Sequence, residues 1–364
     1  MRRPPPLARI PREVACLTDY EPLARERLDD NAWAYLAGTA ADGVTHAANR
    51  AAFDALTLNS RVLREMSGGS TETEFLGMKL RHPVMVAPVA YQKLYHPDGE
   101  RATAMAAGAL DAPMIVSTQT STPIEEVAVA AEGSPLMFQL YWQADRGATR
   151  ALIERVEAAG VRAIVPTADA PISGIRNAEQ RAGFHLPAGI APVMLGQWPP
   201  AQKPLSGHPI FDGLLGHAPT WRDIEWLLGT TKLPVILKGV LSPDDARRAA
   251  DIGCASVVVS NHGGRTIDSL PPSITALPRV VDAVGDRMPV LLDSGIRRGT
   301  DILKALALGA RAVLVGRPLM YALAAAGPLG VGHAIKVLVE ELAVAVALTG
   351  HARITDIGPE AIFR

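Results

Sequence analysis

The feature that most limits the fold of this 364-residue chain is a set of eight short apolar runs between residues 83 and 316. Each run is continuously apolar rather than alternating, which is typical of parallel strands buried on both faces. Stretches with helical periodicity lie between most of them, as crossovers between parallel strands require. The runs are residues 83–89, 113–117, 136–141, 163–167, 234–238, 256–260, 289–293 and 312–316, and the helical stretches are 99–110, 123–131, 145–159, 242–252 and 300–308.

Eight strands that alternate with helices predict an α/β fold, a TIM (β/α)₈ barrel. An open doubly wound sheet usually has fewer strands and a G-x-G-x-x-G turn after the first. Here the first run instead reads into APVAYQK. We expect a single domain over residues 1–364. Its N-terminal helical segment, residues 1–80, contains helices at 20–28 and 30–36 followed by a connector.

One connection is much longer than an ordinary βα unit. Residues 171–233 separate the fourth and fifth strands, and their middle part, 186–219, is rich in proline and glycine with weak periodicity. In a barrel this insertion follows the carboxyl end of a strand, where active sites lie, so we interpret it as a mobile lid over the active site. The alternative is a disordered insertion without a role.

Composition argues against several classes of protein. The formal net charge is −1, and the chain has no basic stripe of the kind that nucleic-acid binders carry. Cys16 and Cys254 are too few and too far apart for a disulfide framework or a zinc site, so we predict free thiols, no metal and a cytoplasmic location. We also expect neither a signal peptide nor a membrane span, because no charge-free apolar window of the required length occurs.

Polar residues recur at the carboxyl ends of the predicted strands, which is where a barrel carries its active site. A purely structural barrel would be indifferent to what stands there, so this convergence predicts a catalytic or binding site. In strand order the ends contribute Pro88, Val89 and Ala90; Ser117; Gln139 and Tyr141; Thr167 and Asp169; Lys238; Ser260 and His262; Asp293; and Gly316.

The last two strands are followed by turns that suit a phosphate group. One turn runs from Asp293 through Ser294 and Gly295 to Arg297, and the other is Gly316-Arg317. Glycine lets the backbone approach an anion, and arginine supplies charge-assisted hydrogen bonds. A single Gly-Arg pair is common turn chemistry, whereas two such turns on adjacent strands favour phosphate binding.

Three kinds of side chain point to chemistry. Lys238 ends an apolar run and could stabilise the N1–C2=O edge of a reduced flavin; its alternatives are a Schiff-base lysine and a structural ion pair. His262 could act as a general base oriented by Asp169, although an isolated histidine is more often structural. Arg176 and Arg265 suit a substrate carboxylate, with a surface salt bridge as the alternative.

Taken together, these segments resemble the FMN-dependent 2-hydroxy-acid dehydrogenases and oxidases, a family that includes glycolate oxidase, lactate oxidase, mandelate dehydrogenase and 4-hydroxymandelate oxidase. The resemblance extends from about residue 35 to about residue 348, and APVAYQ and FQLYW are most similar to the hydroxymandelate oxidase branch. The segments that carry it are APVAYQKLYHPDGE, FQLYW, PTADAP, LPVILKGV, SNHGGRTID, DSGIRRGTD and LVGRPLMYAL.

The resemblance implies a role for each position. His262 would be the catalytic base, with Asp169 and Tyr141 beside it, and the substrate would contact Tyr35, Tyr141, Arg176, His262 and Arg265. FMN would be the cofactor. Its binding residues would be Pro88, Val89, Ala90, Ser117, Gln139, Thr167, Lys238 and Ser260, with the phosphate at Asp293, Ser294, Gly295, Arg297, Gly316 and Arg317.

The implied reaction is oxidation of an (S)-2-hydroxy acid to the 2-keto acid. Ala90 favours O₂ as electron acceptor, with H₂O₂ as product, and many relatives are homo-oligomers, tetramers or octamers. The alternatives are a dehydrogenase that passes electrons to a quinone or cytochrome, a non-redox phosphate-binding isomerase or aldolase barrel, and a flavin-binding protein that has lost activity. An isomerase or aldolase would use Lys238 but would not need FQLYW and SNHGGR together, and the intact His262 and Arg265 argue against an inactive protein.

The sequence departs from the family pattern in three places, of which the first is a mild change at the phosphate and the other two bear on the substrate. Ser294-Gly295 stands where Gly-Gly is usual, and the segment that ends at Arg176 has lost one of two paired arginines. Gln119 stands where plant glycolate oxidases carry tryptophan. Ser173 and Gln119, in place of bulkier residues, predict room for an aromatic acid such as mandelate, with a lactate-type acid as the other candidate.

Overall fold

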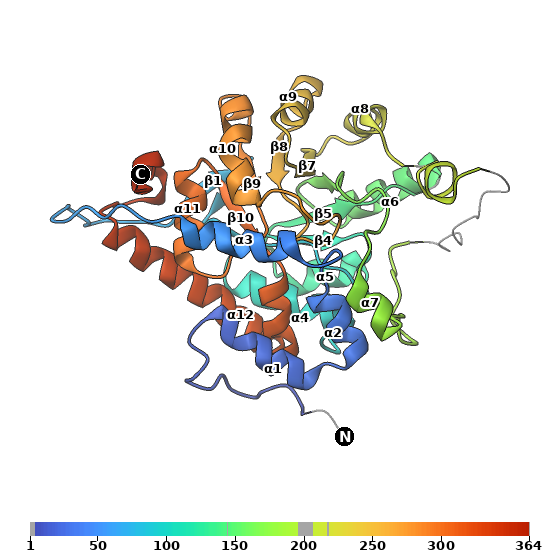
Figure 1. Cartoon of the computed structure of the whole chain (residues 1–364), viewed down its shortest axis with the longest axis horizontal. Coiled ribbons are helices and arrows are strands. Elements are labelled where there is room, and N and C mark those ends of the chain that lie inside the picture. Colours follow the sequence, from blue (N-terminus) through green and yellow to red (C-terminus); the bar gives the residue numbers. More distant parts are fainter. Residues whose placement is uncertain (1–3, 144, 196–206, 217, 364) are drawn as a thin grey trace.

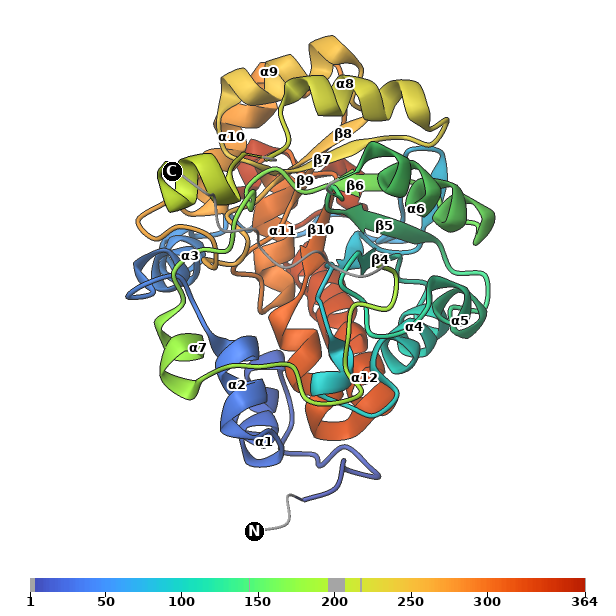
Figure 2. The same ribbon diagram turned by 90° about the vertical axis from the view of Figure 1, so that its right-hand side faces the viewer.

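Eight parallel strands form a closed barrel in the computed structural model, which describes residues 4–143, 145–195, 207–216 and 218–363 (Figures 1 and 2). Each strand pairs with the next along the chain, and the last pairs with the first. Two parallel bridges, Ile164 to Val235 and Thr167 to Lys238, close the ring between β6 and β7. The strands are β3 (Val84–Val86), β4 (Met114–Ser117), β5 (Leu136–Leu140), β6 (Ile164–Pro166), β7 (Ile236–Val240), β8 (Ser256–Val259), β9 (Val290–Leu292) and β10 (Ala312–Val315).

The predicted TIM barrel is therefore confirmed, and the burial of the strands explains why their sequences are continuously apolar. Alternate residues point to opposite faces of a strand. One set fills the barrel interior and the other packs against the surrounding helices, so neither face meets water. The interior set takes one fully buried side chain from each strand: Met85, Ile115, Met137, Val165, Ile236, Val258, Leu291 and Leu314.

An outer layer of helices covers the barrel (Figure 2). All five predicted helices are present: α4 (Gly99–Ala109), α5 (Ile124–Ala130), α6 (Arg146–Ala158), α9 (Pro243–Ile252) and α11 (Gly299–Ala307). The Ser242 side chain accepts hydrogen bonds from the N–H groups of Asp244 and Asp245, the start signal expected for α9. Among the described residues, this layer also contains helices that were not predicted from the sequence: α8 (Trp221–Thr230), α10 (Ser273–Val284) and α12 (Arg317–Leu348).

Helices α10 and α12 each contain an internal proline, which in a sequence argues against a helix. Pro278 lies inside α10. α12 consists of two helical halves that meet at a kink, where Ala326 and Gly327 have non-helical torsion angles just before Pro328. Much of α12 is buried all round, so it lacks the polar face that marks a surface helix. Among the described residues, no helix is long and apolar enough to cross a bilayer.

The N-terminal segment is more structured than predicted. Helices α1 (Tyr20–Arg27) and α2 (Asp30–Ala37) are confirmed, and α1 packs on α12. The predicted connector is wrong, because it contains α3 (Val44–Ala55) and a hairpin of β1 (Thr73–Phe75) and β2 (Met78–Leu80). β2 leads directly into β3, and its apolar side chains join the barrel interior from the amino-terminal end. The hairpin therefore closes the end of the barrel opposite the strand termini that carry the polar residues.

The long connection between β6 and β7 contains α7 (Asn177–Ala182), a short π-helical segment (Pro209–Leu214) and α8. Its first part is attached at both ends. Asn31 of α2 exchanges hydrogen bonds with the backbone of His185, and the N–H of Val193 donates to the carbonyl of Thr120. Residues 196–206 and 217 lie outside the described residues, so the lid stays a prediction.

The contact between α11 and α12 generates a stability prediction. A Cβ on Gly299 would collide with the backbone of Glu341 and Leu342, whereas a Cβ on Gly229, an exposed position in α8, would meet nothing within 4 Å. We expect Gly299→Ala to lower the free energy of unfolding by about 1–3 kcal/mol through overpacking. Gly229→Ala should raise it by about 0.5–1 kcal/mol because alanine favours helix. Urea denaturation of both variants measures this, and equal effects would contradict the close approach.

Candidate active site

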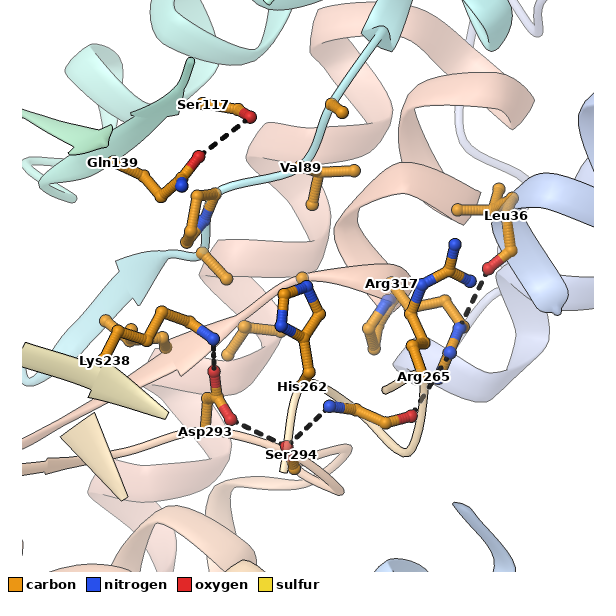
Figure 3. A pocket seen from close by; sticks show the side chains of 18 of the residues that line it. Leu36, Val89, Ser117, Gln139, Lys238, His262, Arg265, Asp293, Ser294 and Arg317 are labelled. Carbon is orange, nitrogen blue, oxygen red and sulfur yellow. Dashed lines mark hydrogen bonds and ion pairs between the residues drawn. The ribbon is translucent and has the colours of Figure 1, made fainter. Parts of the chain in front are cut away.

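A pocket opens at the carboxyl ends of the strands and gathers the residues that the sequence singled out (Figure 3). Among the predicted site residues, only Asp169 and Ser260 do not line it, and both touch residues that do. The lining set is Tyr35, Pro88, Val89, Ala90, Ser117, Gln139, Tyr141, Thr167, Arg176, Lys238, His262, Arg265, Asp293, Ser294, Gly295, Arg297, Gly316 and Arg317.

His262 stands just after β8 with one ring nitrogen committed. Its backbone is in the left-handed region, φ 57°, and is followed by two glycines that also have positive φ. Nδ1 of His262 donates to Oδ1 of Asp169 at 2.9 Å, which leaves Nε2 for the pocket. Burial alone would raise the pKa of Asp169, but the charge of His262, the hydrogen bond to it and Lys238 lower it. Asp169 is therefore a carboxylate that can stabilise a protonated imidazole.

Lys238 is buried beside a carboxylate. Its Nζ lies 3.0 Å from Oδ2 of Asp293 (Figure 3). It also donates to Oγ of Ser260 at 3.0 Å. Burial would lower the pKa of Lys238, but Asp293 and Asp169 outweigh this and raise it. A Schiff-base lysine needs a lowered pKa to act as a nucleophile. The geometry therefore favours a fixed positive charge at this position over the aldolase alternative.

Ser294 connects this ion pair to the histidine turn. Its hydroxyl donates to Oδ1 of Asp293 at 2.7 Å and accepts the N–H of Gly263 at 2.9 Å. On the other side, Ser260 accepts the N–H of His262 at 3.0 Å as well as the Lys238 ammonium. The peptide N–H groups of His262 and Gly263 are thus hydrogen-bonded to two serines, each of which contacts one partner of the buried Lys238–Asp293 pair.

The sequence assigned Asp293 to the phosphate site, and the structure uses its carboxylate differently. Both oxygens are engaged, one by Lys238 and the other by Ser294. Positive charge concentrates farther along, at Arg297 and Arg317, which in the described part of the chain have no carboxylate partner. Burial lowers the pKa of Arg297, and burial together with Arg265 and Arg297 lowers that of Arg317 to about 10. Buried guanidinium groups of this kind require an anion.

The rest of the pocket offers unused hydrogen-bonding groups. Oε1 of Gln139 accepts from Ser117 and from the backbone of Thr118, while its buried Nε2 has no partner among the described residues. The buried hydroxyl of Thr167 is likewise unpartnered there. The polar edges of a flavin ring would satisfy the Gln139 amide and the Thr167 hydroxyl, and a phosphate dianion would pair with the arginines. The pocket therefore fits FMN.

Arg176 and Arg265 face the same pocket and share a carboxylate that the sequence did not reveal. Oε1 of Glu179 accepts from Arg176 at 2.9 Å and from Arg265 at 3.3 Å, and Arg265 also donates to the carbonyl of Gly38. Tyr35, from α2, lies beneath the Arg265 guanidinium, 5.2 Å from ring centroid to Cζ. Glu179 stands three residues after Arg176 at the start of α7, a spacing that brings side chains together on a helix.

The pocket corrects one substrate argument and adds two residues. Ser173 is exposed and does not line the pocket, so the prediction that it leaves room for an aromatic acid is wrong; Gln119 does line it.

Tyr95 lines the pocket as well, with a buried hydroxyl that has no partner among the described residues. His46 accepts from Arg317 at 3.1 Å, and burial lowers its pKa to about 4, so it is a neutral acceptor.

Comparison with known proteins identifies the family. The sequence profile of the FMN-dependent dehydrogenases matches residues 24–364. The chain belongs to this family. Proteins named L-lactate oxidase from Roseobacter sp. and Alicycliphilus denitrificans are each 48% identical, over 94% of this chain and 93% of the relative, and over 97% of both. Glycolate oxidase 5 of Oryza sativa subsp. japonica is 39% identical over 95% of this chain and 94% of its own length.

Solved structures of similar sequence have the same fold as this chain. A crystal structure of mandelate oxidase with benzoyl-formic acid has a TM-score of 0.87 and 40% identity, covering 96% of this chain and 98% of that one. The predicted family, barrel and FMN cofactor are confirmed, and the barrel is that of an FMN-dependent enzyme rather than of an aldolase or isomerase.

Ser294 supplies a prediction for this site. Its φ of 74° is a left-handed conformation that costs a non-glycine residue roughly 1–2 kcal/mol. Ser294→Ala keeps that strain and loses both hydrogen bonds, so we expect it to lower the free energy of unfolding by about 2 kcal/mol. Ser294→Gly loses the same bonds but relieves the strain, so it should be roughly 1 kcal/mol less destabilised. Chemical denaturation compares the two, and a glycine variant as unstable as the alanine variant would contradict the strain.

Proposed function

We propose that this FMN-dependent enzyme oxidises an (S)-2-hydroxy acid to the 2-keto acid and reduces O₂ to H₂O₂. The substrate loses two electrons and two protons, and O₂ takes up the same number. The observation that carries the proposal is the joint placement of a His262–Asp169 pair and two arginines, Arg176 and Arg265, around one pocket that fits FMN. The proteins named as oxidases among the relatives support O₂ over a quinone or cytochrome.

Each residue has a role that follows from its contacts. Arg176 and Arg265 bind the substrate carboxylate, because their planar guanidinium groups match it and Glu179 holds both in place. Nε2 of His262 takes a proton from the substrate, and Asp169 stabilises the imidazolium that results. Bound FMN would supply the two-electron acceptor. Lys238 would contribute a fixed positive charge that stabilises the negative charge of the reduced flavin.

The substrate side chain that we favour is small and aliphatic, as in lactate. Support comes from the 46–48% identity to three proteins named L-lactate oxidase. The pocket agrees, since Tyr35 is stacked on Phe184 at 4.6 Å between ring centroids and is also 6.0 Å from Tyr91, which limits its movement. A mandelate-type acid is the second candidate, favoured by the similarity to mandelate oxidase and by Gln119 at the pocket.

Replacing the base tests the mechanism. We expect His262→Ala to slow anaerobic flavin reduction by the substrate about 10²–10⁴-fold, the usual contribution of a general base. The variant should still bind FMN with an ordinary flavin absorption spectrum, because the side chain is not needed for the arginine or lysine contacts. Stopped-flow bleaching of the flavin measures the rate. Near-normal reduction would remove His262 from the reaction.

A substrate panel tests the specificity and the acceptor. We expect kcat/KM for L-lactate to exceed that for glycolate, mandelate and 4-hydroxymandelate by at least about tenfold, as the 1–3 kcal/mol worth of a methyl-sized contact allows. Peroxide should form in air in proportion to the keto acid. A preference for mandelate would favour the second candidate, and dye reduction without peroxide would contradict oxidase activity.

The remaining predictions concern the whole molecule. We infer one domain over residues 1–364, a cytoplasmic location supported by two free thiols, and a homo-oligomer, a tetramer or octamer. Exposed apolar side chains on the π-helical segment, Ile210, Phe211 and Leu214, supply surface for subunit contacts. Light scattering of the holoenzyme measures the oligomeric state.

A further inference from the structure

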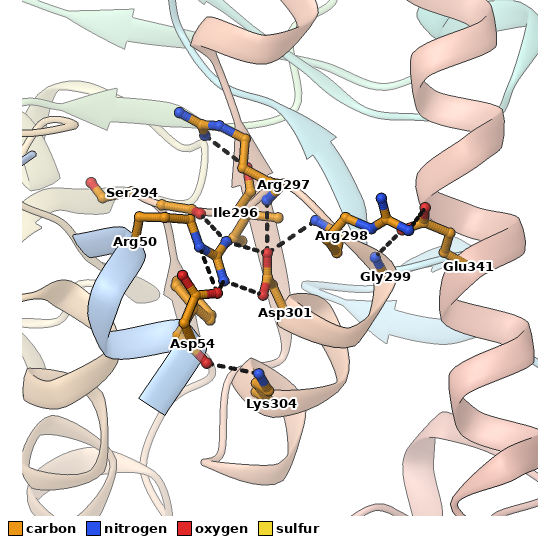
Figure 4. Close-up of polar contacts among 12 residues, drawn as sticks. Arg50, Asp54, Ser294, Ile296, Arg297, Arg298, Gly299, Asp301, Lys304 and Glu341 are labelled. Atoms are coloured by element: carbon orange, nitrogen blue, oxygen red, sulfur yellow. Dashed lines mark hydrogen bonds and ion pairs between the residues drawn. The ribbon is translucent and has the colours of Figure 1, made fainter. Parts of the chain in front are cut away.

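Arg50, on helix α3, holds the loop between β9 and α11 from outside the pocket (Figure 4). Its Nη1 donates to the carbonyl of Gly295 at 2.9 Å and to Oδ2 of Asp301 at 2.6 Å, and its Nη2 donates to Oδ1 of Asp301 at 2.8 Å. Arg50 does not line the pocket. It binds the loop that carries Arg297, although Arg50 and Asp301 lie about 250 residues apart in the sequence.

Asp301 connects Arg50 to the backbone of this loop. The carboxylate is 1% exposed, and its Oδ2 accepts the N–H groups of Arg297 at 2.9 Å and Arg298 at 3.0 Å. Two peptide groups at the position of the phosphate arginine are therefore fixed by an oxygen that Arg50 also holds. On the far side, Glu341 of α12 accepts the N–H of Gly299 at 2.8 Å and pairs with Arg298 at 2.9 Å.

Helix α3 also forms the wall behind Gly295. Gly295 has φ 96°, and a Cβ there would lie 3.0 Å from the carbonyl oxygen of Asn49 and 3.1 Å from the Phe53 ring. The Arg50 guanidinium lies 5.2 Å from the centroid of that ring. Lys304 of α11 donates to the carbonyl of Phe53 at 2.7 Å, which fixes the end of α3 against the barrel. The loop is confined by a side chain, a ring and a backbone that all belong to α3.

We propose that Arg50 is a positioning residue for FMN: through Gly295 and Asp301 it holds the phosphate-binding loop in its binding conformation before the cofactor arrives. The arginine is neutralised by Asp301 and Asp54, so its contribution comes from geometry rather than from net charge. A loop that is already ordered loses less conformational freedom on binding, which increases affinity. The proposal rests on FMN binding and not on the choice of 2-hydroxy acid.

Comparing FMN with riboflavin, which has the same ring and no phosphate, isolates the loop. Apoprotein is titrated with each flavin, and quenching of flavin fluorescence gives the Kd. In Arg50→Met, we expect the Kd for FMN to rise at least about tenfold, while the Kd for riboflavin changes less than about threefold. Arg50→Lys, which keeps the charge but cannot form the two-pronged contact, should give an intermediate loss for FMN only.

Asp54→Asn is the matched control. Asp54 accepts from Nη2 of Arg50 at 2.7 Å and from Nε at 3.1 Å, and it is 67% exposed. Its replacement leaves the donors and acceptors of the contacts to Gly295 and Asp301 in place. It should bind FMN like the parent protein. Asp301→Asn should weaken FMN and riboflavin in the same ratio as Arg50→Met, and the double variant should add little, because both act through one contact.

Three results would overturn the proposal. The first is an unchanged Kd for FMN in Arg50→Met, and the second is an equal loss for FMN and riboflavin, which would mean that Arg50 only fastens α3 to the barrel. The third is a loss in Asp54→Asn as large as in Arg50→Met. If Arg50→Met fails to fold, the FMN-to-riboflavin ratio of Arg50→Lys decides by the same criteria. Turnover of FMN-saturated Arg50→Lys should stay near that of the parent, which separates this role from the proposed chemistry.

Discussion

The buried ion pair between Lys238 and Asp293 is the interaction on which the rest of the site depends. It joins the ends of β7 and β9 across β8, and its two ends hold the peptide groups of His262 and Gly263 through Ser260 and Ser294. Removing one partner of such a pair leaves an uncompensated charge, which typically costs about 3–5 kcal/mol. The position of the base is therefore set by the same ion pair whose Lys238 lines the pocket.

The two ends of the pocket differ in how far their positive charges are balanced by carboxylates. Around Lys238, the ammonium charge is balanced by the carboxylate of Asp293, so this buried pair is neutral before anything binds. The guanidinium groups of Arg297 and Arg317 pair with no carboxylate in the described part of the chain, and burial, Arg265 and Arg297 lower the pKa of Arg317. The phosphate end is thus incomplete without an anion. A fold arranged in this way is more stable with its cofactor than without it, because only the native state binds the anion.

Much of the barrel and of the pocket could be predicted because both follow from local sequence. Strands buried on two faces must be continuously apolar, and polar residues at their carboxyl ends must meet, so His262, Lys238 and Arg317 were found before any contact was known. Helix α3 could not be found in the same way, since Phe53 is the only large apolar side chain that it buries, and its other large apolar residue, Val44, is exposed. Its value to the fold lies in contacts 200 or more residues away, such as Arg50 with Asp301.

Three of the residues that escaped prediction act through another residue rather than by lining the pocket, as Tyr95 does. Glu179 holds two arginines, Arg50 holds a loop, and His46 accepts from Arg317, and none of these pairings leaves a signal in a single sequence beyond a charged residue on a helix. The N-terminal segment supplies Tyr35 on the substrate side and Arg50 behind the phosphate loop, although it precedes the barrel. A chain that began at β3 would therefore keep the strand-end residues but lose the contacts that orient them. The N-terminal segment is thus part of the site rather than an extension of the fold.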